Sequence, residues 1–223
     1  MWNADKIVYR NDDSFVRAYQ GSELVWEKPS SNNKIFYTST DGQIVTPDIG
    51  IGEESKGFGA NIVSNTYSGG RGVIVFDGPV TKIGYTAFGR CNTLQTIVIP
   101  DSVTSIGQIA FFSCERLTSI TIPKSVKHID IGVFGKCTSL ISITIPFSVR
   151  GIKWDAFKDC SQLSEVIVNA VTPPELYPEQ YIGIYNQFEN NAPGRKIKVP
   201  AESLQAYKTA TGWSDYADDI IAQ

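Results

Sequence analysis

The residues of this chain whose type and spacing could do chemistry are its four cysteines. Each stands 23 residues from the next, at Cys91, Cys114, Cys137 and Cys160. Four thiolates could hold a zinc ion, but a tetrahedral site needs its ligands to converge on one point. Two neighbouring cysteines could instead form a disulfide, because the spacing of stacked coils permits that distance. All four could also be buried thiols that pack as small hydrophobic side chains.

The spacing of the cysteines belongs to a repeat of the whole sequence. Residues 80–102, 103–125, 126–148 and 149–171 share one pattern of side chains. The matching positions are Val80, Val103, Val126 and Val149; Ile83, Ile106, Ile129 and Ile152; Phe88, Phe111, Phe134 and Phe157; and Leu94, Leu117, Leu140 and Leu163. A fixed period of this length predicts a solenoid, in which coils stack and like residues form rows. The cysteines then lie along a line, which disfavours a metal site and favours inward-facing, unreactive thiols.

One coil contains a short strand followed by a stop. Ile120 and Ile122 alternate with Ser119 and Thr121, which predicts a strand with one buried face. Pro123 cannot donate to a ladder and ends the strand. The stretch before the strand carries Ala-Phe and, four residues after Ala, Cys, which predicts a turn of helix or 3₁₀ helix on the opposite side. A single coil buries too little to fold alone, so stacking must stabilise it.

The repeat resembles the BspA-like, treponemal-type leucine-rich repeat over about residues 72–171. The residues that carry the resemblance are Leu94, Ile97, Ile99, Pro100, Val103, Ile106, Gly107, Ala110, Phe111 and Cys114, with their counterparts in the other coils. The resemblance implies a right-handed solenoid with a parallel β-sheet on its concave face and short helical or 3₁₀ segments opposite. It also implies a protein of a bacterial surface, or a secreted one, with a role in adhesion and binding.

The flanking sequence divides into three further parts. Residues 1–27 hold three short strand candidates and predict a small β-module. Residues 28–71 are interpreted as a linker and an N-terminal cap, and residues 72–76 as the first strand of the stack. Residues 172–223 are expected to form an insertion, a last strand at Ile197 and Val199, and a helical C-terminal cap.

The outward side of the solenoid strands is the candidate binding face. Its proposed residues are Thr96, Val98, Ser119, Thr121, Ser142, Thr144, Glu165 and Ile167. Val73 and Val75 would extend the face at one end, and Lys196 and Lys198 at the other, so that it runs from apolar through hydroxyl to charged. A simpler explanation also stands: such residues favour exposed strands in general, and residues 34–71 could cover the apolar end.

Other candidate residues point away from catalysis. His128 aligns with Lys82, Ser105 and Gly151, so we expect it to face water. The glycine-rich stretch 50–59 lacks the third glycine of a dinucleotide loop and the Gly-Lys-Ser/Thr of a phosphate loop, which predicts a plain loop. Trp154 occupies a mixed position that predicts half exposure and leaves open a role as an anchor for a partner.

Composition narrows the function class further. The chain has 223 residues and a net charge of −3, with 20 basic and 23 acidic residues, which gives no footprint for nucleic acid. No apolar run is long enough to span a bilayer, and the first residues do not resemble a signal peptide. We therefore expect a binding module without catalytic residues, cofactor or metal, whose partner is a protein or a glycan. The alternative is a structural component of a larger surface or phage-like assembly, attached through residues 1–27.

Overall fold

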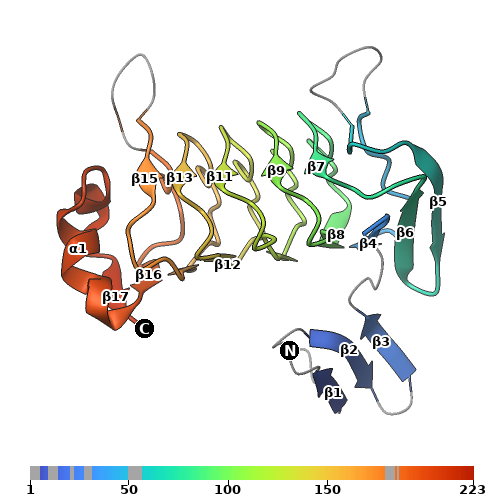
Figure 1. The fold of residues 1–223 in the computed structure, drawn as a ribbon, viewed down its shortest axis with the longest axis horizontal. Helices are drawn as coiled ribbons and strands as arrows, with labels where there is room; N and C mark the ends of the chain where they lie inside the picture. Colours follow the sequence, from blue (N-terminus) through green and yellow to red (C-terminus); the bar gives the residue numbers. More distant parts are fainter. Residues whose placement is uncertain are drawn as a thin grey trace.

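The repeated part of the chain winds into a solenoid whose coils stack side by side (Figure 1). The structure, a computed structural model, describes residues 6–9, 15–20, 23–27, 32–49, 57–178, 184 and 186–223, the first three ranges by their backbone only. The strands of the first part are β1 (Lys6–Tyr9), β2 (Phe15–Gln20), β3 (Glu23–Glu27), β4 (Lys34–Ser39), β5 (Ile62–Ser68) and β6 (Arg71–Phe76). Strands β1, β2 and β3 form an antiparallel sheet of their own, at the predicted strand segments.

Each coil contributes one strand to each of two sheets. The first, which we call the main sheet, contains β8 (Leu94–Val98), β10 (Ser119–Ile120), β12 (Ser142–Ile145), β14 (Glu165–Val168), β16 (Lys196–Val199) and β17 (Ile220–Ala222). Neighbours pair in parallel from β8 to β10 and from β12 to β17, while β10 and β12 lie side by side without a ladder. Strand β17 lies beyond β16, so the prediction that residues 197–199 form the last strand is wrong.

The main sheet begins differently from the prediction. Residues 72–76 are not the neighbour of the first coil: β4 lies between β6 and β8 and pairs antiparallel with both. Strand β5 then pairs antiparallel with β6 at the edge. Apolar alternation in 72–76 matched the repeat, but the same alternation in Lys34–Ser39 fits the space next to β8 equally well. The ring of Tyr37 lies where a side chain on Gly72 would sit, which only glycine permits.

A second sheet, which was not predicted from the sequence, takes its strands from the coils in the same order as the main sheet does. Its strands are β7 (Lys82–Ile83), β9 (Ser105–Ile106), β11 (His128–Ile129), β13 (Gly151–Ile152) and β15 (Glu175–Leu176). Every strand has two residues, which is too short to show alternation in a sequence. The inward isoleucines of this sheet are the repeat's Ile row, and they are buried.

The third side of each coil carries the aromatic column of the core. Phe88, Phe111, Phe134 and Phe157 stack with ring centroids 5.3, 5.6 and 5.4 Å apart and with nearly parallel planes. Each such pair contributes about 0.5–1.5 kcal/mol beyond the area it buries. The chain here forms turns with 3₁₀-type bonds, for example from the Cys114 N–H to the Phe111 carbonyl at 3.1 Å, rather than a continuous helix.

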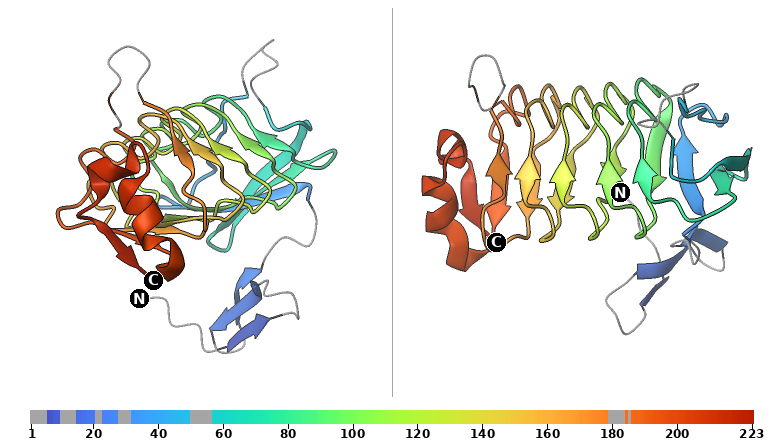
Figure 2. Two further views of the ribbon diagram at one scale, coloured as in Figure 1. Left: turned by 60° about the vertical axis from the view of Figure 1, so that its left-hand side comes forward. Right: turned by 45° about the horizontal axis from the view of Figure 1, so that its top comes forward.

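The helical cap closes the C-terminal end of the core, as Figure 2 shows. It consists of the 3₁₀ helix Ala201–Ser203, helix α1 (Leu204–Thr209) and the 3₁₀ helix Trp213–Tyr216, with Gly212 at φ +77° between the last two. Trp213 and Tyr207 are buried, and their rings meet at 5.1 Å. Their polar atoms donate to the Pro174 and Ala170 carbonyls, both at 2.6 Å, so the cap is bonded to the coil that it covers.

Candidate binding surface

The outward face of the main sheet follows from alternation within its strands. In β12, Ile143 and Ile145 point into the core and are buried, so Ser142 and Thr144 face outward and are exposed. Parallel pairing in register then aligns outward residues of successive coils in rows. Glu165 pairs with Ser142 and Ile167 with Thr144, and Ser119 pairs with Thr96. The stacking thereby turns residues 23 apart in sequence into neighbours.

The eight predicted residues all lie outside the core on this face, but they are not equally accessible. Ser119, Thr121, Ser142 and Thr144 are exposed. Thr96, Val98, Glu165 and Ile167 are half-buried. The structure therefore joins the eight into one surface with a hydroxyl centre.

At one end this face is apolar, and β4 adds to it. Phe36 pairs with Val98 on one side and with Val73 on the other, and all three are half-buried. The Arg71 guanidinium lies 5.6 Å from the centre of the Phe36 ring. Residues 34–39 and 62–68 are strands within the sheet, so these residues lengthen the face and do not cover its apolar end. Residues 50–56 of the same segment lie outside the described residues.

At the other end the face is charged. The Lys198 ammonium forms an ion pair with the Glu165 carboxylate across the β14–β16 pairing. Lys196, opposite Glu165 in the register, is exposed. Because this pair is open to solvent, its net contribution to stability is small. The charges are therefore available to a partner at modest cost in desolvation.

The four cysteines are free thiols arranged in a row. The thiols of Cys114, Cys137 and Cys160 are buried and donate to the carbonyls of Phe88, Phe111 and Phe134, at 3.0, 3.2 and 3.0 Å. Each bond joins one coil to the coil before it. Of the three alternatives that the sequence left open, the structure has the packed thiols for three of the cysteines, whereas Cys91, predicted to be buried as well, is only half-buried.

Burial makes these thiols poor nucleophiles. It raises the pKa of Cys91 to about 11, with a smaller contribution from the nearby Asp48 carboxylate. Burial also raises the pKa of Cys114 and of Cys137 well above the usual value of a thiol. Since the thiolate is the reactive and metal-binding form, the row is suited to packing. Among the described residues, no three His, Cys, Asp or Glu side chains are grouped as a metal site would require.

The other candidate residues named from the sequence are His128, Trp154 and the glycine-rich stretch. His128 is exposed on the outer side of β11, as predicted. Trp154 is half-buried, also as predicted. Most of the glycine-rich stretch 50–59 lies outside the described residues, and so does the side-chain structure of residues 1–27.

The columns of phenylalanines and cysteines continue past the insertion, which was not predicted from the sequence. Phe188 stacks on Phe157 at 5.4 Å and leads to Tyr216 at 5.3 Å. Asn191 takes the place of a cysteine, because its Nδ2 donates to the Phe157 carbonyl at 2.7 Å. The signal was available: Phe188 follows Phe157 by the repeat plus the eight-residue insertion.

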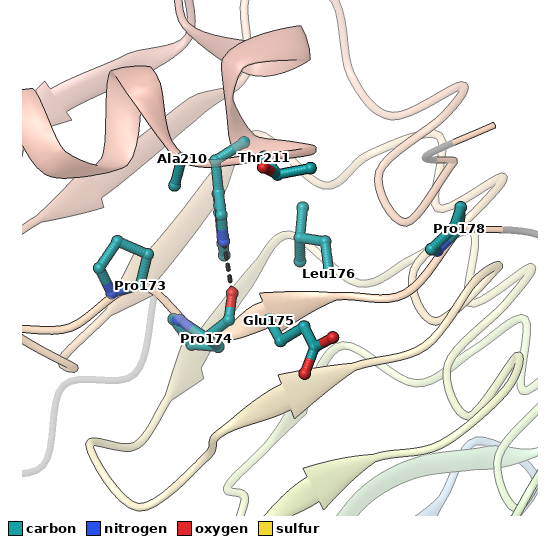
Figure 3. A pocket seen from close by; sticks show the side chains of 8 residues that line it. Pro173, Pro174, Glu175, Leu176, Pro178, Ala210 and Thr211 are labelled. Atoms are coloured by element: carbon teal, nitrogen blue, oxygen red, sulfur yellow. Dashed lines mark hydrogen bonds between the residues drawn. The ribbon is translucent and has the colours of Figure 1, made fainter. Parts of the chain in front are cut away.

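A shallow depression lies where the cap meets the last coil (Figure 3). Its volume is about 410 Å³. It is lined by Pro173, Pro174, Glu175, Leu176, Pro178, Ala210, Thr211 and Trp213. The indole N–H of Trp213 donates to the Pro174 carbonyl, so this polar group of the lining already has a hydrogen-bond partner. The depression supplies apolar contact, the Glu175 carboxylate and the Thr211 hydroxyl, which is too little to define a ligand.

The repeated part of the chain matches a known repeat family. Residues 66–173 match the family described as BspA type Leucine rich repeat region, in six copies. This part of the chain is a BspA-type leucine-rich repeat region. The match covers the coils whose Val, Ile, Phe and Leu rows form the core, so family and structure agree on the same residues.

Solved structures of bacterial leucine-rich repeat proteins are similar to this chain. A leucine rich cell surface protein of Faecalibacterium prausnitzii is 32% identical, with TM-score 0.42, over 52% of this chain and 30% of its own. A leucine-rich repeat protein of T. pallidum is 24% identical, with TM-score 0.49, over 66% and 63%. One from Bacteroides ovatus is 22% identical, with TM-score 0.37, over 65% and 48%. The chain thus spans less than two thirds of the length of these proteins.

No curated protein matches the chain. Among the helices of the described residues, none has the length and apolar character needed to cross a membrane.

Proposed function

We propose that this BspA-type repeat protein is a non-catalytic recognition module that binds a protein or a glycan through the outward face of the main sheet. The observation that carries the proposal is the group of exposed hydroxyls at Ser119, Thr121, Ser142 and Thr144, which lie on two neighbouring coils. Strand β10 is held in register by β8 and strand β12 by β14. A rigid sheet presents these groups without the cost of ordering them on binding.

The chemistry of the face supports a macromolecular partner. It offers apolar contact around Phe36, hydroxyl donors and acceptors in the centre, and charge at Glu165 and Lys198. Such a graded surface can bind one extended partner at several points, and the polar centre can specify its register. The family resemblance favours the same class of function, together with a location at the cell surface or outside the cell.

The test replaces the hydroxyl centre. Changing Ser119, Thr121, Ser142 and Thr144 all to Arg should abolish capture of the partner, measured by pull-down and on a glycan array against the unchanged protein. Bulk and charge at these positions block contact, while the inward residues stay intact. The far-ultraviolet circular dichroism spectrum and the melting temperature report whether the fold survives.

A matched control adds the same net charge elsewhere. Ser105→Arg, Gln108→Arg and Glu115→Arg together change exposed residues away from this face. The control should bind as the unchanged protein does. Equal capture by the unchanged protein and the four-residue variant would show that the outward face is not the binding surface.

A second candidate is a structural component attached through its N-terminal part. The observation that favours it is that β1, β2 and β3 pair only with one another and not with the sheets of the solenoid. Deletion of residues 1–27 should then abolish incorporation into the assembly, measured by co-sedimentation, while the four-residue Arg variant assembles normally. The opposite pair of results supports recognition through the main sheet.

A further inference from the structure

The corners that lead out of the main sheet are fixed in position by the backbone. Pro123–Val126 and Pro146–Val149 each close a turn in which the valine N–H donates to the proline carbonyl, at 3.1 and 3.0 Å. The serine of the second turn, Ser148, donates through its hydroxyl to the Val126 carbonyl of the preceding coil at 2.8 Å. The residue after each proline therefore points outward from a rigid corner.

Two adjacent corners carry an unusual set of outward side chains, which we call the corner patch. It consists of Lys124, Lys127, Phe147 and Arg150. Phe147 is 65% exposed, the largest exposed fraction but one among the large hydrophobic residues described, and the three basic residues are exposed as well. The backbone N–H of Arg150 donates to the Lys127 carbonyl at 2.8 Å, so these two basic residues lie next to each other on neighbouring coils.

The repeat itself does not require these side chains. Asp101 stands at the position of Lys124 and Phe147 in the coil before, and Thr81 and Thr104 stand at the position of Lys127 and Arg150. The same corner is therefore formed with small or acidic residues. Within the described part of the chain, Lys124, Lys127 and Arg150 form no ion pair. Neither packing nor an internal charge partner accounts for the patch.

We propose that the corner patch binds an acidic segment of a partner protein, with Phe147 against an apolar side chain of that segment. Three unpaired cations on a chain of net charge −3 give local complementarity to carboxylates, which speeds encounter and fixes orientation. An exposed aromatic ring beside an arginine is the composition enriched at the centres of protein interfaces. A simple polyanion would use the cations but not the ring. This surface is distinct from the outward face of the main sheet.

The test uses the full chain and two fluorescein-labelled peptides of glutamates. One peptide has two central leucines, and the other has glutamines in their place. Fluorescence anisotropy at about 50 mM salt should show tighter binding of the leucine peptide, with weakening at about 500 mM salt as the charges are screened. Lys127→Glu with Arg150→Glu should weaken binding of both peptides by about tenfold or more. Phe147→Ser should remove the preference for leucine and keep the salt dependence.

The repeat supplies a charge-matched control at other positions. Arg116→Glu with Lys136→Glu reverses two exposed basic residues outside the patch and should leave peptide binding within about twofold of the unchanged protein. A variant with Ser119, Thr121, Ser142 and Thr144 all changed to Gln, which adds bulk without charge, should also bind the peptides, which separates this proposal from the preceding one. Failure of both peptides to bind overturns the proposal. So does equal affinity for the two peptides, or binding of heparin that depends on Arg150 while Phe147→Ser has no effect on any ligand.

Discussion

The central coils and the coil at the C-terminal end fill the same interior positions with different chemistry. In the centre, the positions beside the phenylalanine column hold Ala110 and Cys114, both buried. In the last coil, Gln187 and Asn191 hold them. The side chain of Gln187 is fully buried, and its Nε2 donates to the Tyr177 carbonyl at 2.6 Å and to the Ile152 carbonyl at 3.3 Å.

The difference lies in the side chains and not in the backbone pairing between coils. In the centre, the Phe111 N–H donates to the Val133 carbonyl at 2.9 Å, and in the last coil the Phe157 N–H donates to the Gln187 carbonyl at 2.9 Å. The side-chain amides of the last coil add hydrogen bonds to carbonyls of the neighbouring segments. At these positions the central coils therefore rely on packing of small side chains, and the last coil relies on packing together with amide hydrogen bonds.

The largest effect is expected where the aromatic column is interrupted in its centre. Phe134→Ala should lower the free energy of unfolding by about 3–5 kcal/mol, because it removes stacking on both neighbours and leaves a cavity. Urea denaturation followed by circular dichroism measures the change. As control, Phe147→Ala changes an exposed ring and should stay within about 0.5 kcal/mol. Comparable losses in both variants would contradict a packed column.

The second largest effect concerns the row of thiols. A cysteine can lose its proton at high pH, whereas Asn191, which takes the place of a cysteine in the last coil, cannot. Cys91 has a pKa of about 11 in the folded protein, above the 9.0 of an unperturbed thiol. The folded state therefore holds this proton more tightly, so its stabilisation is complete below about pH 9 and is lost as the pH rises through 11. Each pKa unit corresponds to about 1.4 kcal/mol. Cys91→Ser should make the decline between pH 9 and 11 shallower, by about 2–3 kcal/mol at most.

The measurement for this prediction is urea denaturation of both proteins across that pH range. Thiol labelling at pH 8 provides an independent check, because buried neutral thiols react slowly in the folded chain and rapidly in urea. Identical pH profiles for the two proteins would mean that burial does not hold the proton of Cys91.

A third test addresses the polar replacement in the last coil. Gln187→Ala restores the residue type of the central coils but leaves the Tyr177 and Ile152 carbonyls without this donor, which should cost about 1–3 kcal/mol. Equilibrium denaturation measures the cost. Gln187→Glu, which keeps the size but lacks the donor when ionised, should be at least as destabilising. A neutral effect of both changes would show that the hydrogen bonds of Gln187 add nothing to packing.

The smallest effect is expected at the surface of the central coils. The Lys153 ammonium lies 3.0 Å from the Asp130 carboxylate, with both side chains about a third exposed. Solvent screens such a pair, so Lys153→Ala should cost less than about 1 kcal/mol, and the cost should fall with added salt. Thermal denaturation at low and high salt checks this. A large, salt-independent loss would mean that Lys153 contributes through packing.

Much of the candidate site could be predicted, because it repeats. The inward residues of each coil must be apolar and must match their neighbours, so Ile143 and Ile145 place Ser142 and Thr144 outward without knowledge of the structure. The neighbours of the end strands could not be predicted in the same way. Strand Lys34–Ser39 has an alternation that fits either edge of a sheet, and nothing local specifies which strand it pairs with.

The sequence by itself determined the period, the buried rows and the outward face, because stacking demands that like side chains recur at equal spacing. Only the tertiary structure decided the insertion of β4 before the first coil, the second sheet of two-residue strands and the addition of β17 at the far end. It also decided that Gln187 and Asn191 continue the core. The physical reason is that these features depend on backbone hydrogen bonds between distant segments. Every residue except proline can both donate and accept such bonds, so they leave little trace in the pattern of side chains.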